Sequence, residues 1–480
     1  MNSRLFSVSV AVAAICAVAP GSATVVAPAK TSRQNAPAPA STAAPNRGMR
    51  LIRTGDSRGS IMVTGPSGCS SDGPLSFTGG GSGNYPGGSA SGILSGTSNE
   101  ACDAQSTVGG GTNNVIGGDG GSYSAAIVAG LAGSIELSAG AVIAGGLNNI
   151  ISDEPPYYNS NLSVIGGGDG NVIGSPDSFI GSGQANTIVP PAVKLASGNS
   201  PSAFIGAGYG NSITSDFAVI TGGLDNANTG EYATIGGGLT NVVSGAYATI
   251  GGGYNNAASG IQAVVAGGYG NVASGRNAMV PGGAYNTAGG LDSFAAGNAA
   301  QAPYSGTFVW SDYSVPSGIS ATAANQFIAR SAGGFYLYSS ANLATGVKLA
   351  PGSGSWSTVS DRAAKTGIEE IDDARILAKV ASLPVSEWSY TAQGPGVRHL
   401  GPMAQDFRAA FGLGEDEKHI STVDEEGVAL ASIKALQAEV ADKDGRLNDL
   451  DQKYALLEQR LETLEKHMHR PHTSGRSSGI

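Results

Sequence analysis

Ser360 and Lys365 stand five residues apart in the segment SDRAAK and are the side chains best suited to covalent chemistry. A serine hydroxyl becomes a useful nucleophile when a base takes its proton, and a lysine can be that base when burial favours its neutral form. Serine and lysine at this spacing are common, so the spacing alone favours a solvated surface pair. A reactive dyad and an ordinary surface pair therefore both stay open at this point.

Other reactive side chains form no comparable group. A glycan hydrolase needs a positioned pair of carboxylates, whereas Asp216, Asp225 and Glu231 recur at no fixed site and are typical of solvated turns. His399 lies in the C-terminal third, and most of the other histidines lie near the end of the chain. We expect no metal site and no cofactor.

The chain ahead of Ser360 repeats every 15 residues. A fixed period this short predicts a β-solenoid, in which each coil holds two short strands and two turns. An apolar residue precedes the glycine cluster of each repeat: Ile205, Ile220, Ile235, Ile250, Val265, Val280 and Ala295. An asparagine follows six residues after the first six of them: Asn211, Asn226, Asn241, Asn256, Asn271 and Asn286.

The segment YATIG shows how one repeat is built. Alternation predicts that Ala233 and Ile235 point to the interior while Tyr232 and Thr234 point away from it. We expect the glycines and the asparagines such as Asn241 at tight turns with positive φ. Stacked asparagines can also form a side-chain ladder between coils.

Composition excludes some classes of protein, whereas the repeats predict a mainly β fold. The 75 glycines have no G-X-Y period, which excludes collagen, and a formal net charge of −10 gives no reason to expect nucleic acid as a partner. We predict the following parts: a signal peptide at 1–23, a Pro/Ala-rich linker at 24–50, an irregular Gly/Ser-rich cap at 51–107, solenoid repeats at 108–300, a β-rich neck at 301–357, a small α+β module at 358–432, a coiled coil at 433–468 and a disordered tail at 469–480.

The first residues are typical of an export signal, with Arg4, the apolar stretch LFSVSVAVAAICAVA and a small-residue cleavage site at Gly21–Ala23. Export would place the protein at the cell surface, at the outer membrane or outside the cell. Disulfides persist in such compartments, and only Cys69 and Cys102 follow the cleavage site. A Cys69–Cys102 disulfide and two separate thiols both stay open.

The C-terminal segment carries a heptad pattern. Apolar residues alternate steps of three and four over five heptads, with one lysine among them, which predicts a coiled coil. We call these positions the heptad seam: Ile433, Leu436, Val440, Lys443, Leu447, Leu450, Tyr454, Leu457, Leu461, Leu464 and Met468. A single helix lying on its own domain is the alternative, and the mixed seam does not choose between two and three strands.

The repeat ATIGGGxxNxxSGxYATIGGG, over residues 108–300, resembles the head repeats of trimeric autotransporter adhesins and related phage fibre proteins. That resemblance implies left-handed parallel β-rolls of three chains packed side by side. The 15-residue step is slightly longer than is common in adhesin heads.

The segments SDRAAK and RHLGPMAQDF, with the coiled coil after them, resemble the intramolecular chaperone auto-processing domain of phage endosialidase tail spikes. The resemblance implies a homotrimer that cuts itself once, with Ser360 as nucleophile and Lys365 as base, and with Val359 and Asp361 beside the scissile bond. It also assigns His399, Gly401 and Gln405 to the domain motif. Residues 363 and 364 are alanines, where bulkier residues are common in the family.

Together these features predict an exported, homotrimeric, fibre-like or adhesin-like surface protein whose only chemistry is one self-cleavage. A glycan or matrix component of a host or cell surface stays open as a ligand of the head. The alternatives are a passive structural rod without self-cleavage and a tail-spike-like hydrolase acting on polysaccharide.

Overall fold

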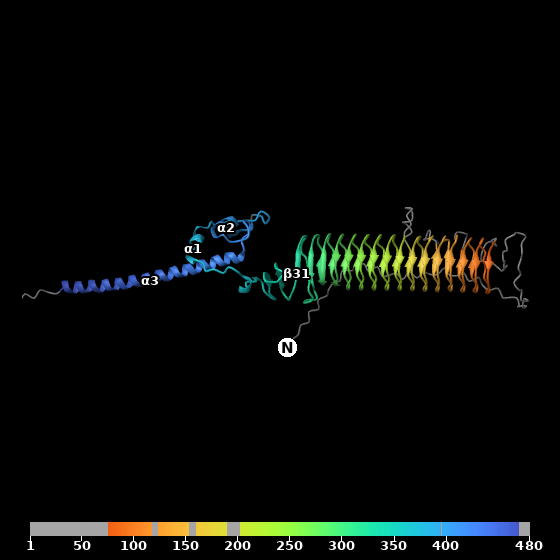
Figure 1. Cartoon of the computed structure of the whole chain (residues 1–480), viewed down its shortest axis with the longest axis horizontal. Helices are drawn as coiled ribbons and strands as arrows, with labels where there is room; N and C mark the ends of the chain where they lie inside the picture. The colour runs from red at the N-terminus through yellow and green to blue at the C-terminus, as the bar shows by residue number, and fades with distance from the viewer. Residues whose placement is uncertain (1–74, 118–122, 153–159, 190–201, 395, 470–480) are drawn as a thin grey trace, which may run out of the picture. The chain divides into compact units, whose positions relative to one another are not determined.

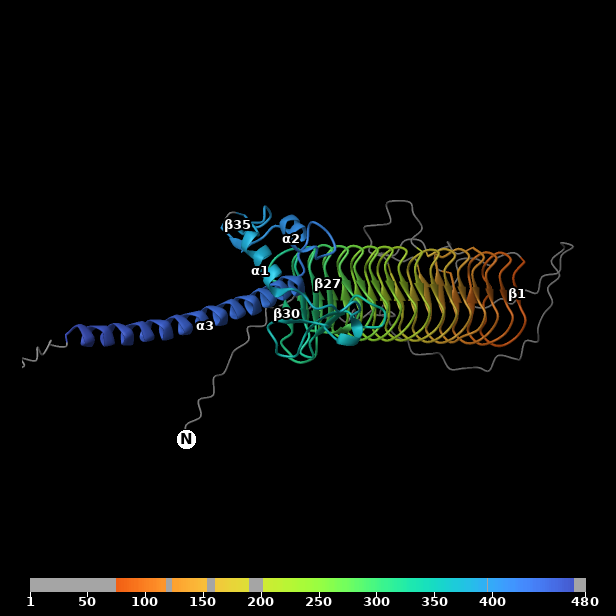
Figure 2. The ribbon, with the colours of Figure 1, turned by 60° about the vertical axis from the view of Figure 1, so that its left-hand side comes forward.

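The computed structural model describes residues 75–117, 123–152, 160–189, 202–394 and 396–469. The chain divides into two compact units, Met1–Gly267 and Gly268–Ile480. The predicted signal peptide and linker, the first part of the predicted cap and nearly all of the predicted tail lie outside the described residues. Within the first unit, coils stack on one another and each contributes strands of two or three residues (Figures 1 and 2).

The strands of the solenoid form two parallel sheets in the described part of the chain, one of 17 strands and one of 14. The larger sheet contains β1 (Phe77–Thr78), β2 (Gly92–Ile93), β4 (Thr107–Val108), β6 (Ala126–Ile127), β8 (Val142–Ile143), β10 (Val164–Ile165), β12 (Phe179–Ile180), β14 (Phe204–Ile205), β16 (Val219–Ile220), β18 (Thr234–Ile235), β20 (Thr249–Ile250), β22 (Val264–Val265), β24 (Met279–Val280), β25 (Gly283–Ala284), β27 (Phe294–Asn298), β29 (Phe308–Ser311) and β31 (Phe327–Arg330). The smaller sheet contains β3 (Glu100–Ala101), β5 (Val115–Ile116), β7 (Ser134–Glu136), β9 (Ile150–Ser152), β11 (Val172–Ile173), β13 (Thr187–Ile188), β15 (Ser212–Ile213), β17 (Ala227–Asn228), β19 (Val242–Val243), β21 (Ala257–Ala258), β23 (Val272–Ala273), β26 (Thr287–Ala288), β28 (Ala300–Ala302) and β30 (Ile319–Ser320).

The predicted solenoid and its interior residues are confirmed. Ile235 pairs in parallel with Ile250 one coil further along, and both side chains are fully buried. Ala233 is buried beside Ile235, whereas Tyr232 is exposed, as the alternation predicts. A second strand of each coil adds another apolar residue to the interior, for example Val243. Most strands of the stack therefore bury one apolar residue, although β17 buries Asn228 instead, and a coil needs its neighbours for this burial.

The asparagine ladder is also confirmed. Asn241 is fully buried and its Nδ2 donates to Asn226 Oδ1 at 3.2 Å, to Gly237 O at 3.0 Å and to Gly253 O at 2.9 Å. Its Oδ1 accepts from the backbone N–H and from Nδ2 of Asn256, at 3.0 and 3.1 Å. Each asparagine thus ties its own turn to the coils on both sides of it.

The prediction that these asparagines take positive φ is wrong. The left-handed residue is the one before each ladder asparagine, such as Thr240 with φ 51° and Asn255 with φ 54°. The third glycine of a triplet does take positive φ, 95° at Gly238, and a Cβ there would collide with the Gly253 carbonyl oxygen. The ladder asparagine is needed inside the turn, where its amide satisfies backbone groups that water cannot reach.

The solenoid extends beyond the predicted range of 108–300 on both sides. Regular coils begin at β1, so the described part of the predicted irregular cap, 75–107, is solenoid. The strands β29, β30 and β31 continue the two sheets into the predicted neck. The steps from Ala295 to Val309 and from Val309 to Ile328 depart from 15 residues, which is why the sequence period ends before the fold does.

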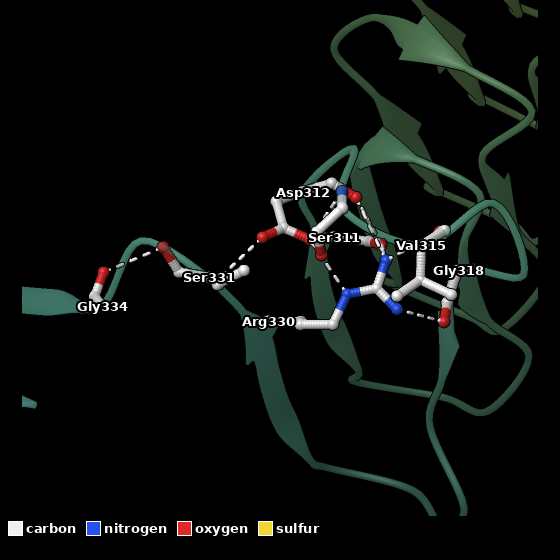
Figure 3. Close-up of polar contacts among 9 residues, drawn as sticks. Ser311, Asp312, Val315, Gly318, Arg330, Ser331 and Gly334 are labelled. Atoms are coloured by element: carbon white, nitrogen blue, oxygen red, sulfur yellow. Dashed lines mark hydrogen bonds and ion pairs between the residues drawn. The ribbon is translucent and has the colours of Figure 1, made fainter. Parts of the chain in front are cut away.

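Arg330, at the end of the last solenoid strand β31, fastens the preceding loop (Figure 3). Its Nε donates to Asp312 Oδ1 at 3.0 Å, its Nη1 to Gly318 O at 2.7 Å and its Nη2 to Ser311 Oγ at 2.9 Å. Within the stack, loop carbonyls accept hydrogen bonds from backbone N–H groups of the following coil. At β31, the last strand of the stack, the Arg330 guanidinium donates to the loop carbonyls in their place.

Asp312 is the second member of this hydrogen-bonded group, and we call Arg330 and Asp312 together the clamp. Its carboxylate accepts from the backbone N–H of Ala332 at 2.6 Å and from the Ser314 hydroxyl at 2.6 Å. These two hydrogen bonds, followed by the one from Arg330, hold the pKa of Asp312 well below its ordinary value of 3.8. The clamp therefore needs the ionised carboxylate.

The C-terminal part of the second unit is a small sheet followed by an α+β module. The sheet is antiparallel and contains β32 (Phe335–Tyr338), β33 (Gly346–Leu349) and β34 (Trp356–Thr358). The module contains a 3-10 turn η2 (Arg362–Ala364), α1 (Asp373–Ser382), β35 (Ser386–Trp388), β36 (His399–Gly401), α2 (Ala404–Phe411) and α3 (Thr422–Met468). Among the described residues, none of the helices is both long and apolar enough to cross a membrane.

The predicted C-terminal helix is confirmed, and it begins earlier than the coiled coil assigned to 433–468. The first turns of α3 bury Val428, Ala431 and Ala435, while Lys434 Nζ lies 2.7 Å from Asp373 Oδ2 of α1. Asp372 caps α1 by accepting from the Arg375 N–H at 3.1 Å. The start of α3 therefore belongs to the module, and only its continuation is free for other contacts.

Candidate active site

Ser360 follows directly on the small sheet. Val359 N–H still donates to Gly346 O at 2.9 Å, which extends the pairing of β34 with β33 by one residue. The next residue, Ser360, is exposed, and so are all residues of 361–370. The polypeptide around the serine is therefore an accessible segment between the small sheet and α1.

A single tight turn brings Lys365 back to Ser360. Asp361 is the N-cap of η2, and its Oδ1 accepts from the Ala363 N–H at 2.9 Å. Lys365 N–H donates to Arg362 O at 3.1 Å and closes the turn. As a result the Lys365 ammonium donates to Ser360 Oγ at 2.7 Å. The structure thus joins the two residues that the sequence predicts as a dyad.

The turn explains why these residue types occur together. An aspartate is a strong N-cap because its carboxylate accepts a backbone N–H that the helix leaves unpaired. Asp361 therefore holds the turn that brings Lys365 to Ser360, a capping role that was not predicted from the sequence. The signal was the Asp two residues before Ala363, a common capping pattern.

The exposure of the pair limits what one chain can do. A lysine accepts a proton from serine when burial disfavours its charged form. Lys365 and Ser360 are both exposed in the single chain. The 2.7 Å hydrogen bond matches the geometry of a nucleophile beside a base, but this exposed pair lacks the burial that would favour a neutral amine.

His399 belongs to a hairpin cluster. Its ring stacks on Trp388 with centroids 4.7 Å apart, meets Tyr390 edge-on at 5.4 Å and lies with Nε2 2.7 Å from Gln393 Oε1. The strands β35 and β36 pair His399 with Trp388 directly. These contacts give His399 a structural role in the hairpin, and they do not connect it with Ser360.

The other two motif residues have open surroundings. Gly401 ends β36, and a Cβ added there would meet nothing within 4 Å. Gln405 lies exposed in the first turn of α2. Among the described residues of one chain, nothing around Gly401 requires a glycine, and the Gln405 amide is exposed.

The structure describes only one of the two cysteines of the predicted disulfide. Cys102 follows β3 and is disulfide-bonded. Cys69, the predicted partner, lies outside the described residues, so the Cys69–Cys102 pairing stays a prediction.

The heptad seam on α3 is exposed along its whole length. Its apolar side chains are between 46% and 76% exposed. An exposed apolar stripe of this length marks a surface that packs against another molecule or element. Ion pairs between residues four apart, such as Lys453–Asp449 and Lys466–Glu462, lie at positions outside the seam. The helix thus has a polar surface and one long apolar stripe.

Comparison with known proteins supports the C-terminal assignment. Residues 360–413 match the Peptidase S74 family, described as chaperone of endosialidase. No curated protein matches the chain. The matched segment begins at Ser360 and includes Lys365, the hairpin and α2. The chain therefore carries a chaperone-of-endosialidase domain behind a long β-solenoid.

Proposed function

We propose that this protein is the subunit of a homotrimeric fibre whose C-terminal module assembles three chains and then cuts itself off at Ser360. The observation that carries the proposal is the 2.7 Å contact between Lys365 Nζ and Ser360 Oγ, at the first residue of the segment that matches the chaperone family.

Assembly starts from the heptad seam of α3. This row of exposed apolar side chains, interrupted by Lys443, is stable in water when it packs against equivalent helices. The first turns of α3 are anchored on α1, so association of the seams also gathers the modules. Gly401 and Gln405, which face open space in one chain, are then available for contacts between modules.

Chemistry follows assembly. When a neighbouring module covers the SDRAAK turn, loss of water favours the neutral amine of Lys365. The amine takes the proton of the Ser360 hydroxyl, and Oγ attacks an adjacent peptide carbonyl. The C–N bond breaks, the leaving amine takes up the proton, and water hydrolyses the resulting ester. The enzyme acts once, because nucleophile and substrate belong to the same chain.

The cleavage is tested by expressing the full chain and measuring fragment masses. Wild type should yield a fragment ending beside Ser360 and a C-terminal fragment of about 120 residues, counted from the sequence. Ser360→Ala and Lys365→Ala should leave the chain intact, whereas Ser357→Ala, three residues upstream on the exposed surface of β34, should cleave normally. Intact wild-type chains under conditions where trimers form would refute the peptidase part.

The place of action follows from the predicted signal at 1–23. We propose that the protein is exported and that the solenoid is displayed as a surface fibre with an adhesin-like role. Exposed side chains such as Tyr232 and Tyr247 lie stacked with centroids 5.0 Å apart on the coil surface, and they offer apolar contact area to a ligand. Binding of the cleaved fibre to glycan or matrix arrays tests this role, and the absence of binding favours a passive rod.

A further inference from the structure

The small sheet directly before the cleavage serine has one apolar face. Residues that oppose one another in an antiparallel pair point to the same side. The register pairs Phe335 with Leu349, Leu337 with Val347, and Leu349 with Trp356. Phe335, Leu337, Val347, Leu349 and Trp356 therefore share one side, which we call the apolar sheet face, and Thr358, opposite Val347, is its polar member.

The opposite side of the sheet has a different composition. The register places Tyr336 opposite Lys348, and Lys348 opposite Ser357. Tyr338 joins them, with its ring 6.5 Å from that of Tyr336. The only charged side chain of the three strands, Lys348, thus lies away from the apolar sheet face.

Among the described residues of one chain, nothing fully covers the apolar sheet face. Leu337 is 58% exposed and Trp356 is 54% exposed, while Phe335, Val347 and Leu349 are partly buried. The three strands contain four, four and three residues. The apolar face of a sheet is stable in water when another element packs on it, and a cluster of exposed large apolar side chains marks an interface.

The position of the sheet in the chain decides which fragment keeps it after cleavage. Thr358 ends β34, and Ser360 is the second residue after it. Cleavage at Ser360 therefore leaves the sheet with the solenoid and removes the heptad seam. The seam cannot hold the mature chains together, and an uncovered sheet would be left at their new C-terminal end.

We propose that the apolar sheet face packs against the same face of other copies of this chain and keeps the fibre oligomeric after the module has left. This inference rests on the proposed assembly and cleavage. The partner is a second copy because the α3 helices bring copies together at high effective concentration before cleavage. The face is also uncharged, so equal copies meet without repulsion.

Cross-linking of single cysteine variants of the full chain tests the contact. Leu337→Cys lies on the apolar sheet face, and Tyr336→Cys is its neighbour on the opposite side. Leu450→Cys on the heptad seam reports whether copies associate at all. Each variant is combined with Ser360→Ala, so that the readout does not depend on cleavage, and is treated with a short bis-maleimide. The Ser360→Ala chain with its native cysteines gives the background.

The proposal predicts that Leu337→Cys and Leu450→Cys give cross-linked chains well above background, whereas Tyr336→Cys does not. Cross-linking of Leu450→Cys without Leu337→Cys would overturn the sheet contact and leave the proposed assembly intact. Equal cross-linking of Leu337→Cys and Tyr336→Cys would overturn the assigned face. No cross-linking of any variant would refute the proposed assembly together with this inference.

A second variant measures the consequence in the cleaved fibre. Leu337→Asp in the otherwise wild-type chain should still assemble and cleave, because the seam and the dyad are unchanged. Its mature fragment should then dissociate to monomers in light scattering, whereas the matched variant Tyr336→Asp keeps the oligomer of wild type. A Leu337→Asp fragment that remains as oligomeric as wild type would overturn the proposal.

Discussion

The asparagine ladder allows a quantitative prediction about the solenoid. Replacing Asn241 by alanine removes the three hydrogen bonds donated by its amide and the two accepted by its Oδ1. The backbone N–H of Asn256 loses its acceptor at 3.0 Å, and the carbonyl of Gly237 loses its donor at 3.0 Å. Each buried polar group left without a partner costs about 1–3 kcal/mol, so the local loss is roughly 2–6 kcal/mol.

Hydrogen exchange of the full-length protein measures this loss where it occurs. A coil opens locally before the whole solenoid unfolds, so amide protection reports the free energy of opening for that coil. A loss of about 2 kcal/mol corresponds to roughly 30-fold faster exchange. We therefore expect amides of the coils around Asn241 and Asn256 to exchange at least that much faster in Asn241→Ala.

The matched control is Asn255→Gly. Asn255 is the exposed neighbour of a ladder asparagine and has φ 54°, and glycine occupies the same position of the repeat at Gly210 and Gly270. This change should leave exchange near the wild-type rate. If Asn241→Ala and Asn255→Gly exchange alike, the ladder does not stabilise the coils and the reasoning is refuted.

Three further predictions concern other parts of the chain. Gly238→Ala should destabilise the solenoid by more than about 1 kcal/mol, because the residue has φ 95° and an added Cβ would collide with the next coil. Gly252→Ala should not, because the atom nearest to an added Cβ there is 3.9 Å away. Equal melting temperatures of the two variants would contradict this prediction. The pKa of Asp312 is lowered in the folded state, so the stabilisation by its carboxylate is present above the ordinary pKa of 3.8 and is lost as the pH falls below that value. The difference in unfolding temperature between wild type and Asp312→Asn should therefore narrow from pH 7 toward about pH 3. A difference that stays constant with pH would be evidence against the clamp. Leu447→Asp on the heptad seam should abolish assembly and cleavage in size-exclusion and gel assays, whereas Leu456→Asp, exposed on α3 but outside the seam, should not; cleavage in a monomeric Leu447→Asp chain would show that the dyad acts without neighbours.

The interior of the solenoid could be predicted because its period is regular. Ile235 and Ile250 repeat at 15 residues, and a repeating apolar position must lie where coils stack. The beginning of the solenoid was missed although the same six-residue interval joins Ile93 with Asn99. The coil there is surrounded by glycine and serine, which conceals a single apolar position.

The conformation of the turns could not be predicted from residue type. Asparagine is suited both to left-handed φ and to hydrogen bonding inside a turn. Asn255 and Asn256 stand side by side, the first with φ 54° and the second buried in the ladder. Only the packing of one coil on the next assigns the two roles.

The dyad was predicted from its match to a family motif and from the chemistry of serine and lysine. The spacing alone could not bring the two side chains together, because that depends on the turn capped by Asp361. The exposure of Ser360 and Lys365 could not be predicted either, since it depends on which surfaces one chain covers and which it leaves to other chains.

Native mass spectrometry of the wild type and of Ser360→Ala tests the central claim most directly. The account predicts a trimer of fragments that end beside Ser360, with the C-terminal fragment released from wild type, and a trimer of intact chains for Ser360→Ala. Intact monomers from both proteins would contradict it.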